Sequence, residues 1–429
     1  MSTTEVGSYF ISNYPPFSFW KDDLVPEAER VLNSAPAQKT PLGLYLHIPF
    51  CRKRCKFCYF RVYTDKNANE IGDYMDALAK EIALYSRLSM MGDRDFRFVY
   101  FGGGTPSYLG SKQLQKLIED LRKSISWDKA EEVTFECEPG TLHEHKVQAL
   151  KDIGVTRLSL GIENFNDDIL EENGRAHLSP EVYKAYEWIQ NTGFDSVNID
   201  LIAGMVGETW ENWQDCVRRA VELDPDSVTI YQMELPYNTI YSRAILQDDE
   251  SSPVADWETK RNWVDYAFKE LEEAGYRVSS AYTMVKGDSK FVYRDALWHG
   301  ADLVGAGVAS FSHVNGVHYQ NIDTYEKYIE MLSQDEIPLG RALPVSSNQS
   351  LIREMILQLK TGRLDTGYFK QKFDTDILEV FGEVFSKYED DALLTRSNGD
   401  IHLTRKGLLQ VDGMLPEFFE TQHQNARYT

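Results

Sequence analysis

The chain has 429 residues and a net charge of −22 at pH 7. A chain of this length can bury a large core, and we expect one large domain with appendages. The acidic balance argues against nonspecific binding to nucleic acid or anionic membranes. No apolar run reaches the roughly 18–20 residues that a membrane span requires. The first residues lack the basic and apolar regions of a signal peptide, so we expect a cytoplasmic protein.

Short apolar segments, rich in β-branched and aromatic residues, alternate with helical patterns between residues 42 and 273. The predicted strands are 44–48, 96–101, 132–137, 157–162, 196–202 and 227–234, and the clearest predicted helices are 71–88, 111–125, 180–191 and 210–222. Six successive strand–helix units predict an α/β fold with a parallel sheet and right-handed crossovers. Six units rather than eight favour an open, partial β/α barrel, with a doubly wound sheet as the alternative.

Four regions are expected along the chain. Residues 1–40 form an aromatic extension that packs on the core, and residues 41–280 form the partial barrel. Residues 281–345 connect and complete the site, and the glycines within 305–310 predict a close approach of the backbone to another group. Residues 346–429 are expected to form a mainly helical, winged-helix-like domain. Its Asn398-Gly399 pair predicts a hairpin, and a final helix is expected from Thr404.

Three of the five cysteines lie within eight positions, directly after the first predicted strand. Cys51, Cys55 and Cys58 have the spacing Cys-x3-Cys-x2-Cys. Three thiolates from one loop can bind three irons of a [4Fe–4S] cluster, which leaves the fourth iron open to a ligand that is not protein. This spacing therefore predicts an iron–sulfur site with one open coordination position.

Two other uses of these cysteines are possible in principle. A structural zinc site would need a fourth Cys or His nearby, and the nearest candidate, His47, lies on the predicted strand. A disulfide would need an oxidising compartment, for which the sequence offers no support. The remaining cysteines, Cys137 and Cys216, occur singly in a strand and a helix and are expected to be buried thiols.

Polar residues gather where the six predicted strands end. Besides the cysteine loop, they are Gly102–Pro106, Glu136, Glu138, Glu163, Asn164, Asp200, Gln232 and Glu234. In parallel α/β architectures ligands bind at the carboxyl ends of the strands. Six strand ends that bring polar groups to one rim predict the position of the site.

The cysteine spacing, followed by a Gly-Gly-Gly-Thr-Pro segment after the second strand, resembles the radical S-adenosylmethionine (SAM) superfamily. More narrowly, it resembles the oxygen-independent coproporphyrinogen III oxidase-like branch. That branch includes the oxidase, a haem chaperone, anaerobic haem-degrading enzymes and class C radical SAM methyltransferases. Further stretches that carry the resemblance are 47–51, 159–165, 173–177 and 200–209.

The resemblance implies a [4Fe–4S] cluster on Cys51, Cys55 and Cys58, with SAM chelating the open iron and forming a 5′-deoxyadenosyl radical. It also implies that two SAM molecules bind. Residues implied at the first SAM are Tyr45, Gly103, Gly104, Thr105 and Glu136, with backbone N–H groups of the glycine segment directed to the ligand. Residues implied at the second SAM are Phe57, Glu163, Arg175 and Asp200, with Met233 and Phe311 as apolar walls.

Three positions depart from the pattern of the oxidase. Phe60 stands where the oxidase has a further cysteine, Glu163 where it has glutamine, and Glu138 where relatives often have asparagine. Two additional carboxylates in one rim indicate a cationic ligand, a proton-transfer role, or both. Glu138 and Glu163 are therefore the candidate catalytic residues.

These departures favour class C-type methyl or methylene transfer from a second SAM to an unsaturated small molecule. The alternatives are oxidative decarboxylation of a porphyrinogen or related tetrapyrrole, and a haem-binding chaperone with His299, His313 or His318 as axial ligands. The expected partners are a small-molecule substrate (an unsaturated natural product, a quinone or a tetrapyrrole) and a reductase or flavodoxin-type electron donor.

Overall fold

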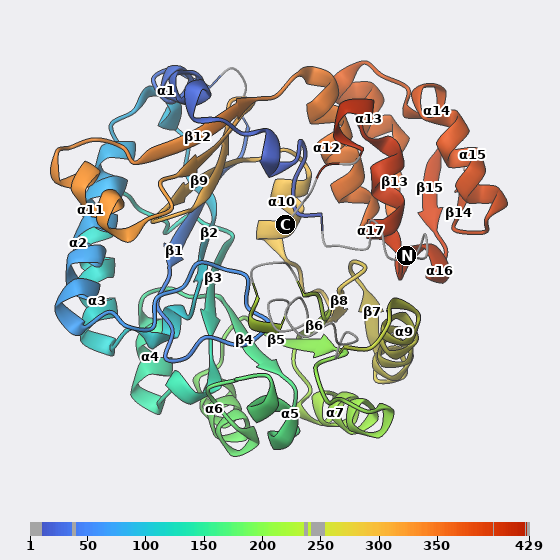
Figure 1. Ribbon diagram of the computed structural model, residues 1–429, viewed down its shortest axis with the longest axis horizontal. Helices are drawn as coiled ribbons and strands as arrows, with labels where there is room; N and C mark the ends of the chain where they lie inside the picture. Colours follow the sequence, from blue (N-terminus) through green and yellow to red (C-terminus); the bar gives the residue numbers. More distant parts are fainter. Residues whose placement is uncertain are drawn as a thin grey trace.

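The computed structural model describes residues 11–36, 40–235, 239–241, 254–397, 399–424 and 426. A 12-stranded sheet has the order β12-β11-β10-β9-β1-β2-β3-β4-β5-β6-β8-β7, and a separate 3-stranded sheet has the order β13-β15-β14. Figure 1 shows the large sheet curving through the centre, with most of its helices along the outside. None of the helices in the described ranges is long and apolar enough to cross a membrane.

Six parallel strands form the middle of the large sheet in chain order. They are β1 (Leu42–Ile48), β2 (Phe96–Gly103), β3 (Glu132–Cys137), β4 (Arg157–Glu163), β5 (Ser196–Ala203) and β6 (Ser227–Gln232). The helices between and after them are α2 (Ala68–Tyr85), α3 (Ser111–Leu121), α4 (Glu144–Asp152), α5 (Asp167–Glu172), α6 (Ser179–Thr192), α7 (Trp210–Leu223) and α9 (Trp257–Glu273). Since the order of strands runs from β12 to β7 without closing, the barrel is partial, as the count of six units predicted.

Both edges of this parallel core carry further strands. β9 (Asp302–Ala306) pairs parallel to β1 and is followed by the antiparallel strands β10 (Phe311–Val314), β11 (Val317–Asn321) and β12 (Leu339–Pro344). At the other edge β8 (Thr283–Lys286) pairs with β6, and β7 (Tyr276–Val278) pairs with β8. Helices α10 (Val292–Trp298) and α11 (Tyr325–Ser333) lie between these strands in sequence. The segment after the barrel therefore extends the same sheet in both directions.

The C-terminal region contains small helices around the 3-stranded sheet. It comprises α12 (Ser347–Leu359), β13 (Arg363–Asp365), α13 (Thr366–Phe373), α14 (Ile377–Val380), α15 (Gly382–Asp390), β14 (Leu394–Ser397), β15 (Asp400–Leu403), α16 (Arg405–Leu408) and α17 (Val411–Met414). β14 and β15 form the predicted antiparallel hairpin, although Asn398 of its turn lies outside the described residues. The helix predicted from Thr404 is α16, and the Thr404 side chain caps it by accepting from Gly407 N at 3.1 Å.

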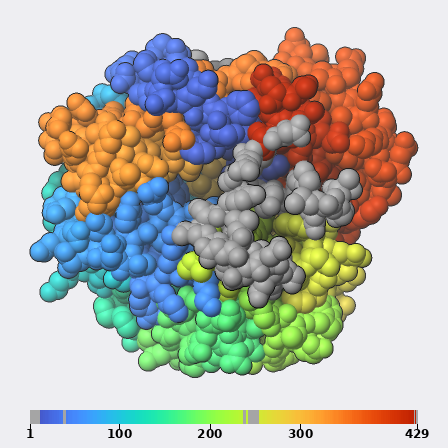
Figure 2. Space-filling model, in the orientation of Figure 1, coloured from blue at the N-terminus to red at the C-terminus, as the bar shows by residue number. Residues whose placement is uncertain are grey.

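The N-terminal aromatic segment packs between the core and the C-terminal region. Tyr14 is fully buried, and its hydroxyl forms a 2.8 Å hydrogen bond with His423 Nδ1. Lys21 exchanges backbone hydrogen bonds with Ala342 of β12, and helix α1 (Val25–Leu32) follows. Figure 2 shows this segment, in dark blue, lying against both the orange strands and the red C-terminal region. Seven short 3₁₀ turns complete the described elements: Phe17–Phe19, Asp22–Leu24, Ser89–Met91, Pro106–Tyr108, Pro139–Thr141, Leu415–Phe418 and Thr421–His423.

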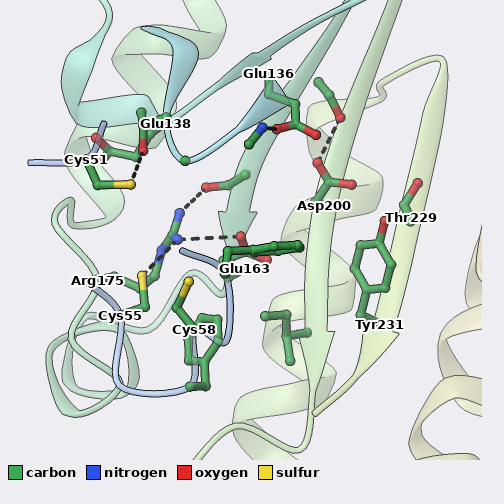
Figure 3. Close-up of a pocket in the computed structure, with 18 of the residues that line it drawn as sticks. Cys51, Cys55, Cys58, Glu136, Glu138, Glu163, Arg175, Asp200, Thr229 and Tyr231 are labelled. Carbon is green, nitrogen blue, oxygen red and sulfur yellow. Dashed lines mark hydrogen bonds and ion pairs between the residues drawn. The ribbon is translucent and has the colours of Figure 1, made fainter. Parts of the chain in front are cut away.

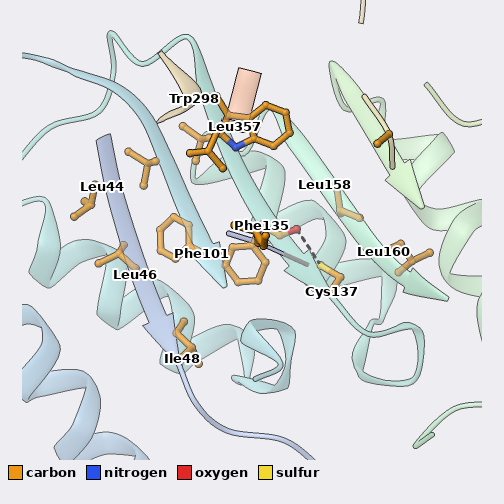
Figure 4. Packing of buried hydrophobic residues seen from close by; sticks show 14 of the residues in the cluster. Leu44, Leu46, Ile48, Phe101, Phe135, Cys137, Leu158, Leu160, Trp298 and Leu357 are labelled. Carbon is orange, nitrogen blue, oxygen red and sulfur yellow. Dashed lines mark hydrogen bonds between the residues drawn. The ribbon is translucent and has the colours of Figure 1, made fainter. Parts of the chain in front are cut away.

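Side chains that alternate along the strands form a hydrophobic core on one face of the sheet and a more polar lining on the other. In β1, Leu44, Leu46 and Ile48 are buried on one face, where they pack in the main hydrophobic core with the rings of β2 and β3 (Figure 4). Successive side chains of a strand point to opposite faces. Tyr45 and His47 therefore point to the other side, toward the barrel interior. The polar side chains of the site stand on this inner face.

The glycine-rich segment after β9 makes the close backbone approach that its sequence predicted. A Cβ on Gly305 would lie 2.2 Å from the Phe311 carbonyl oxygen, and one on Gly307, at φ +107°, would lie 2.6 Å from the Tyr74 hydroxyl. Beside it, the buried carboxylate of Glu81 accepts from Gly307 N, Tyr328 Oη and Asn321 Nδ2 at 2.6–2.8 Å. Glu81 thus joins α2 to the segment after β9, to β11 and to α11.

Replacing Glu81 with alanine should lower the free energy of unfolding by about 3 kcal/mol, because three buried donors would lose their acceptor. The measurement is equilibrium denaturation in urea. Glu119→Ala, on the exposed face of α3, is the control and should change the same quantity by less than about 0.5 kcal/mol. Equal free energies of unfolding for the two variants would contradict a stabilising role for the hydrogen bonds of Glu81.

Candidate active site

A cavity of about 440 Å³ lies inside the partial barrel, lined by residues at the carboxyl ends of its strands and by others deeper along them. The cysteine loop lines one side, and residues of β2 to β6 line the inner wall. Tyr282 and Asp412 extend the wall to the strand β8 side and to the C-terminal region. Apart from Gly102 and Asn164, the rim residues predicted from the sequence line this one space.

All three cysteines of the loop line this cavity and are free thiols. Burial, with a smaller contribution from the neighbouring thiols, raises the pKa of Cys51 to about 12 and that of Cys58 to about 11. Within the described ranges, however, no three His, Cys, Asp or Glu side chains converge on a position for a single metal ion. The cavity wall carries three thiols from one loop.

The glycine segment at the end of β2 is hydrogen-bonded to the backbone that leads into the cysteine loop. Gly104 N donates to Ile48 O and Thr105 N donates to Phe50 O, both at 2.9 Å. Thr105 Oγ1 donates to Cys51 Sγ at 3.3 Å. A Cβ on Gly104 would lie 3.0 Å from Cys51 Sγ and 2.9 Å from Pro49 C, so a side chain there would displace the loop.

These hydrogen bonds correct one expectation. The sequence predicted that the backbone N–H groups of Gly103, Gly104 and Thr105 point to a ligand, but the structure uses all three within the protein. Gly103 N donates to Glu136 Oε2 at 3.2 Å, and the other two hold the cysteine loop. The three residues nevertheless line the cavity.

Glu136 ends β3 and faces the cavity beside an aromatic wall. Its carboxylate accepts from Tyr100 Oη at 2.7 Å as well as from Gly103 N. Burial raises the pKa of Glu136 to about 7, and the nearby Asp200 carboxylate adds to this, while the hydrogen bond from Tyr100 opposes it. Near neutral pH this side chain can therefore donate or accept a hydrogen bond.

Arg175 connects the cysteine loop to the strand ends. Its Nη2 donates to Gly161 O at 2.7 Å, its Nη1 lies 3.4 Å from Cys55 Sγ, and Nη1 lies 3.6 Å from Glu163 Oε1 (Figure 3). The guanidinium is a fixed positive charge beside sulfur atoms that are negative in a metal-bound state. It therefore offsets part of the charge that three thiolates bring to the cavity.

Glu163 has a strained backbone at a break in the sheet. Although Glu163 is not a glycine, its backbone φ is +65°. The pairing of β4 with β5 shifts register between Gly161 and Glu163. Such a left-handed conformation costs roughly 1–3 kcal/mol and persists where the surrounding structure enforces it. Burial raises the pKa of Glu163 to about 7, opposed by Arg175 and increased by Asp200 and Glu136. With this backbone conformation, a carboxyl group whose pKa is near 7 lines the cavity.

The second candidate catalytic carboxylate, Glu138, is more tightly bound. Its Oε1 accepts from His177 Nδ1 at 2.9 Å and from Gly140 N at 3.1 Å, and Arg52 lies 3.7 Å away. Burial opposes its ionisation, but the hydrogen bond and charge of His177, with Arg175 and Arg52, outweigh it and lower the pKa of Glu138. An ionised carboxylate held in this way is suited to fixing the strand end, which makes proton transfer by Glu138 a poor match to its surroundings.

Asp200 and the predicted apolar wall complete this part of the site. Asp200 accepts from Ser159 Oγ at 2.8 Å and from Asn198 Nδ2 at 3.0 Å, and burial raises its pKa. Phe57 packs with Met233 in a small apolar cluster, and both line the cavity. The structure therefore brings these three predicted residues together with the cysteines.

Two predicted cofactor residues, Tyr45 and Phe311, are not among the described residues that line the cavity. Tyr45 stands behind it, stacked on Tyr100 at a centroid distance of 5.9 Å, with its hydroxyl 3.2 Å from His47 Nδ1. Phe311, on β10, packs against Phe17 and Trp20 of the N-terminal segment at 5.3 and 5.5 Å. Phe311 remains 45% exposed, and its contact with the N-terminal segment is a long-range one that no local pattern indicates.

The three histidines considered as haem ligands are also placed elsewhere. His318 is fully buried, stacked on Trp20, and hydrogen-bonded to His313 Nδ1 and to Tyr14 O. Burial lowers the pKa of His318 to about 3, so it is neutral. His299 lies on the surface, with Nδ1 bonded to Asp295 O. None of the three is among the described residues that line the cavity.

Other residues of the cavity wall were not predicted as site residues. Arg157 at the start of β4, Asn198, Tyr231 near the end of β6, and Asp412 in α17 all line it. Arg157 and Asn198 look like ordinary positions of amphipathic strands, and Asp412 is far away in sequence. Strand alternation could have assigned Arg157 and Asn198 to the inner face, because each shares its strand face with a predicted site residue.

Comparison with known proteins agrees with this geometry. A model of the radical SAM superfamily matches residues 45–220, and a model of the HemN C-terminal domain matches residues 345–409. The chain therefore contains a radical SAM domain. Its C-terminal region is similar to that of HemN, and its full-length relatives include oxygen-independent coproporphyrinogen III oxidases and the heme chaperone HemW.

Individual relatives match over most of their length. The heme chaperone HemW of Bacillus subtilis is 25% identical over 85% of this chain and 96% of its own. The oxygen-independent coproporphyrinogen III oxidases of Synechocystis and Escherichia coli are each 26% identical, over 96% and 90% of this chain and 92% and 87% of their own. The solved structure of the Escherichia coli oxidase superposes with a TM-score of 0.83 at 24% identity, over 95% of this chain and 96% of that one, which shows the shared fold.

These relatives do not support class C methyl transfer, the function favoured by the sequence. They are named as oxidases and chaperones, which were the two alternatives. A radical SAM domain implies a [4Fe–4S] cluster and SAM. The residues present fit such a cluster, because three free thiols line one cavity with a fixed guanidinium beside one of them.

Replacing Cys51, Cys55 or Cys58 singly with alanine should abolish the visible absorption of the reconstituted cluster and lower its bound iron and sulfide to near background. The reason is that each thiolate is one of only three in the loop. Cys216→Ala, a fully buried thiol away from the cavity, should retain both signals. A loop variant with the full iron content of the parent would refute the assignment.

In the protein without its cluster, the free energy of unfolding should fall as pH rises from about 4.5 to 8. The folded pKa of Glu163 is near 7 and its ordinary value is 4.5, so the folded state binds the proton more tightly. The stability from protonated Glu163 is complete below pH 4.5 and is lost as pH rises through 7. Glu163→Gln should remove the part of this fall that Glu163 causes, which is about 3 kcal/mol. Denaturation at several pH values tests it, with Glu119→Gln as the control that keeps the full slope.

Proposed function

We propose that this protein is an oxygen-independent oxidase of the coproporphyrinogen type, which converts carboxyethyl side chains of a tetrapyrrole to vinyl groups. Support comes from the extent of the likeness: the match to the Synechocystis oxidase covers 96% of this chain, and that to the Bacillus chaperone covers 85%. The positions of the histidines also favour this choice over the chaperone, since His313 and His318 are bonded to each other and neutral.

The chemistry divides between the bound groups and the protein. The cluster with SAM supplies a strongly oxidising radical that removes one hydrogen atom from the side chain. Loss of one further electron to an external acceptor and of carbon dioxide then leaves the vinyl group. The role of the chain is to hold the reacting carbon against the SAM site and to exclude water, because orientation decides which hydrogen is taken.

The residues of the cavity match these tasks. Arg175 places its charge at the cysteine loop through its bonds to Cys55 and Gly161. Glu136 and Glu163, each with a pKa near 7, present carboxyl groups that can accept a hydrogen bond from pyrrole N–H groups or from SAM. The single observation that carries the proposal is that one cavity joins the cysteine loop, these two carboxyl groups and the C-terminal region.

The test is an anaerobic assay of the reconstituted, reduced protein with SAM and coproporphyrinogen III. We expect carbon dioxide, 5′-deoxyadenosine and vinyl-bearing product in matched amounts, and Cys55→Ala should reduce all three to background. S-adenosylhomocysteine with a methylated product would overturn the proposal in favour of methyl transfer. Tight haem binding with no turnover of the porphyrinogen would overturn it in favour of the chaperone.

A further inference from the structure

Arg157 is a buried cation with open hydrogen-bonding capacity. Its side chain is 3% exposed, lines the cavity and lies over the ring of Phe291 at 4.2 Å. Its Nε has no acceptor, and within the described ranges its guanidinium forms no hydrogen bond or ion pair with the protein. Leaving a buried guanidinium without acceptors costs several kcal/mol, so a position of this kind calls for a partner.

Other well-buried arginines of the chain are bonded. Arg94 pairs with Asp302 at 2.6 Å, Arg353 donates to Asn13 Oδ1 at 2.7 Å, and Arg294 donates to Ser279 Oγ at 2.9 Å. Arg175, in the same cavity, donates to Gly161 O. Arg157 thus differs from these four arginines, each of which has a hydrogen bond or an ion pair within the protein.

The carboxylates near Arg157 balance its charge without using its N–H groups. Glu136 accepts from Tyr100 and Gly103, and Asp200 accepts from Ser159 and Asn198. The charge of Arg157 still acts on both, since it opposes the rise in pKa that burial causes in each. Arg157 lines the cavity together with both carboxylates, and its Nε has no acceptor there.

Arg157 and the cysteine loop stand at different levels of the barrel. Arg157 is the first residue of β4, and Glu163, which contacts the cysteine loop through Arg175, is the last. Six residues of strand span about 20 Å, at roughly 3.3 Å each. The cavity therefore has an iron–sulfur end and an inner end where Arg157 is the cation.

We propose that Arg157 binds a carboxylate of the ligand that occupies the inner end of the cavity. A carboxylate accepts two parallel hydrogen bonds from one guanidinium, and Phe291 beneath the plane keeps that plane fixed. This inference rests on the proposed function, in which the substrate carries several carboxylates. SAM also carries one, so the two sources share the same chemistry and are separated by experiment.

The experiment measures binding rather than turnover, on the reconstituted protein. Its probes are coproporphyrin III, a stable tetracarboxylate, its tetramethyl ester, and SAM, each titrated by calorimetry. Arg157→Met should weaken the tetracarboxylate by 10- to 100-fold and leave the ester and SAM unchanged, because only the charged, bidentate contact is lost. Loss of affinity for SAM alone would support the same site with the cofactor as the source of the carboxylate.

Unchanged affinity for all three probes, or equal loss for the acid and its ester, would overturn the proposal. Arg157→Lys keeps a buried charge without the planar fork, so it should lose less affinity than Arg157→Met and protects the test against misfolding. The matched control is Arg122→Met, which removes another arginine that lies over an aromatic ring, Trp127, but on the surface.

Failure of the proposed function gives a different result. In that case the parent protein would bind neither porphyrin, while a small dicarboxylate such as glutarate would still raise its melting temperature through Arg157. Absence of that rise in the Arg157→Met variant would support the carboxylate site on its own. An identical rise in the parent and the variant would overturn it.

Discussion

The docking of the cysteine loop on the glycine segment is the contact on which the site depends. Two backbone hydrogen bonds, from Gly104 and Thr105 to the carbonyls of Ile48 and Phe50, fix where the loop leaves β1. The absence of a Cβ at Gly104 lets Cys51 approach within the same layer. Arg175 contacts this loop through Cys55 and pairs with Glu163, so one of the cavity carboxylates is tied to the loop.

Burial of charge inside the barrel sets the chemistry of the cavity. Glu136 and Glu163 stand on neighbouring strands and share a poorly solvated space with Asp200, so their pKa values rise toward neutrality. Glu138 is only two residues from Glu136, yet its pKa falls because His177 and Arg52 reach it. Two carboxylates of one strand end thus differ in charge state through their partners, and only one of them keeps an exchangeable proton near pH 7.

Much of this arrangement follows from local sequence patterns. Strand and helix periodicity located the six parallel units to within a few residues, because each strand is a short apolar run bounded by clear breaks. The cysteine spacing and the residues at strand ends located the cavity wall. Contacts between distant segments could not be predicted in this way. Phe311 packs against Phe17 and Trp20, and Tyr282 is hydrogen-bonded to Asp412. Such pairings depend on how whole segments pack.

Asp412 joins three parts of the chain that are far apart in sequence. It accepts from Ile11 N at 3.1 Å, pairs with the fully buried Lys360 at 2.7 Å, and is bonded to the Tyr282 hydroxyl at the cavity wall. Because these segments are far apart in sequence, this part of the cavity wall forms only where the N-terminal segment, the β8 side and the C-terminal region meet. Removal of α17 would therefore take away both a wall residue of the cavity and the ion pair of Asp412 with Lys360.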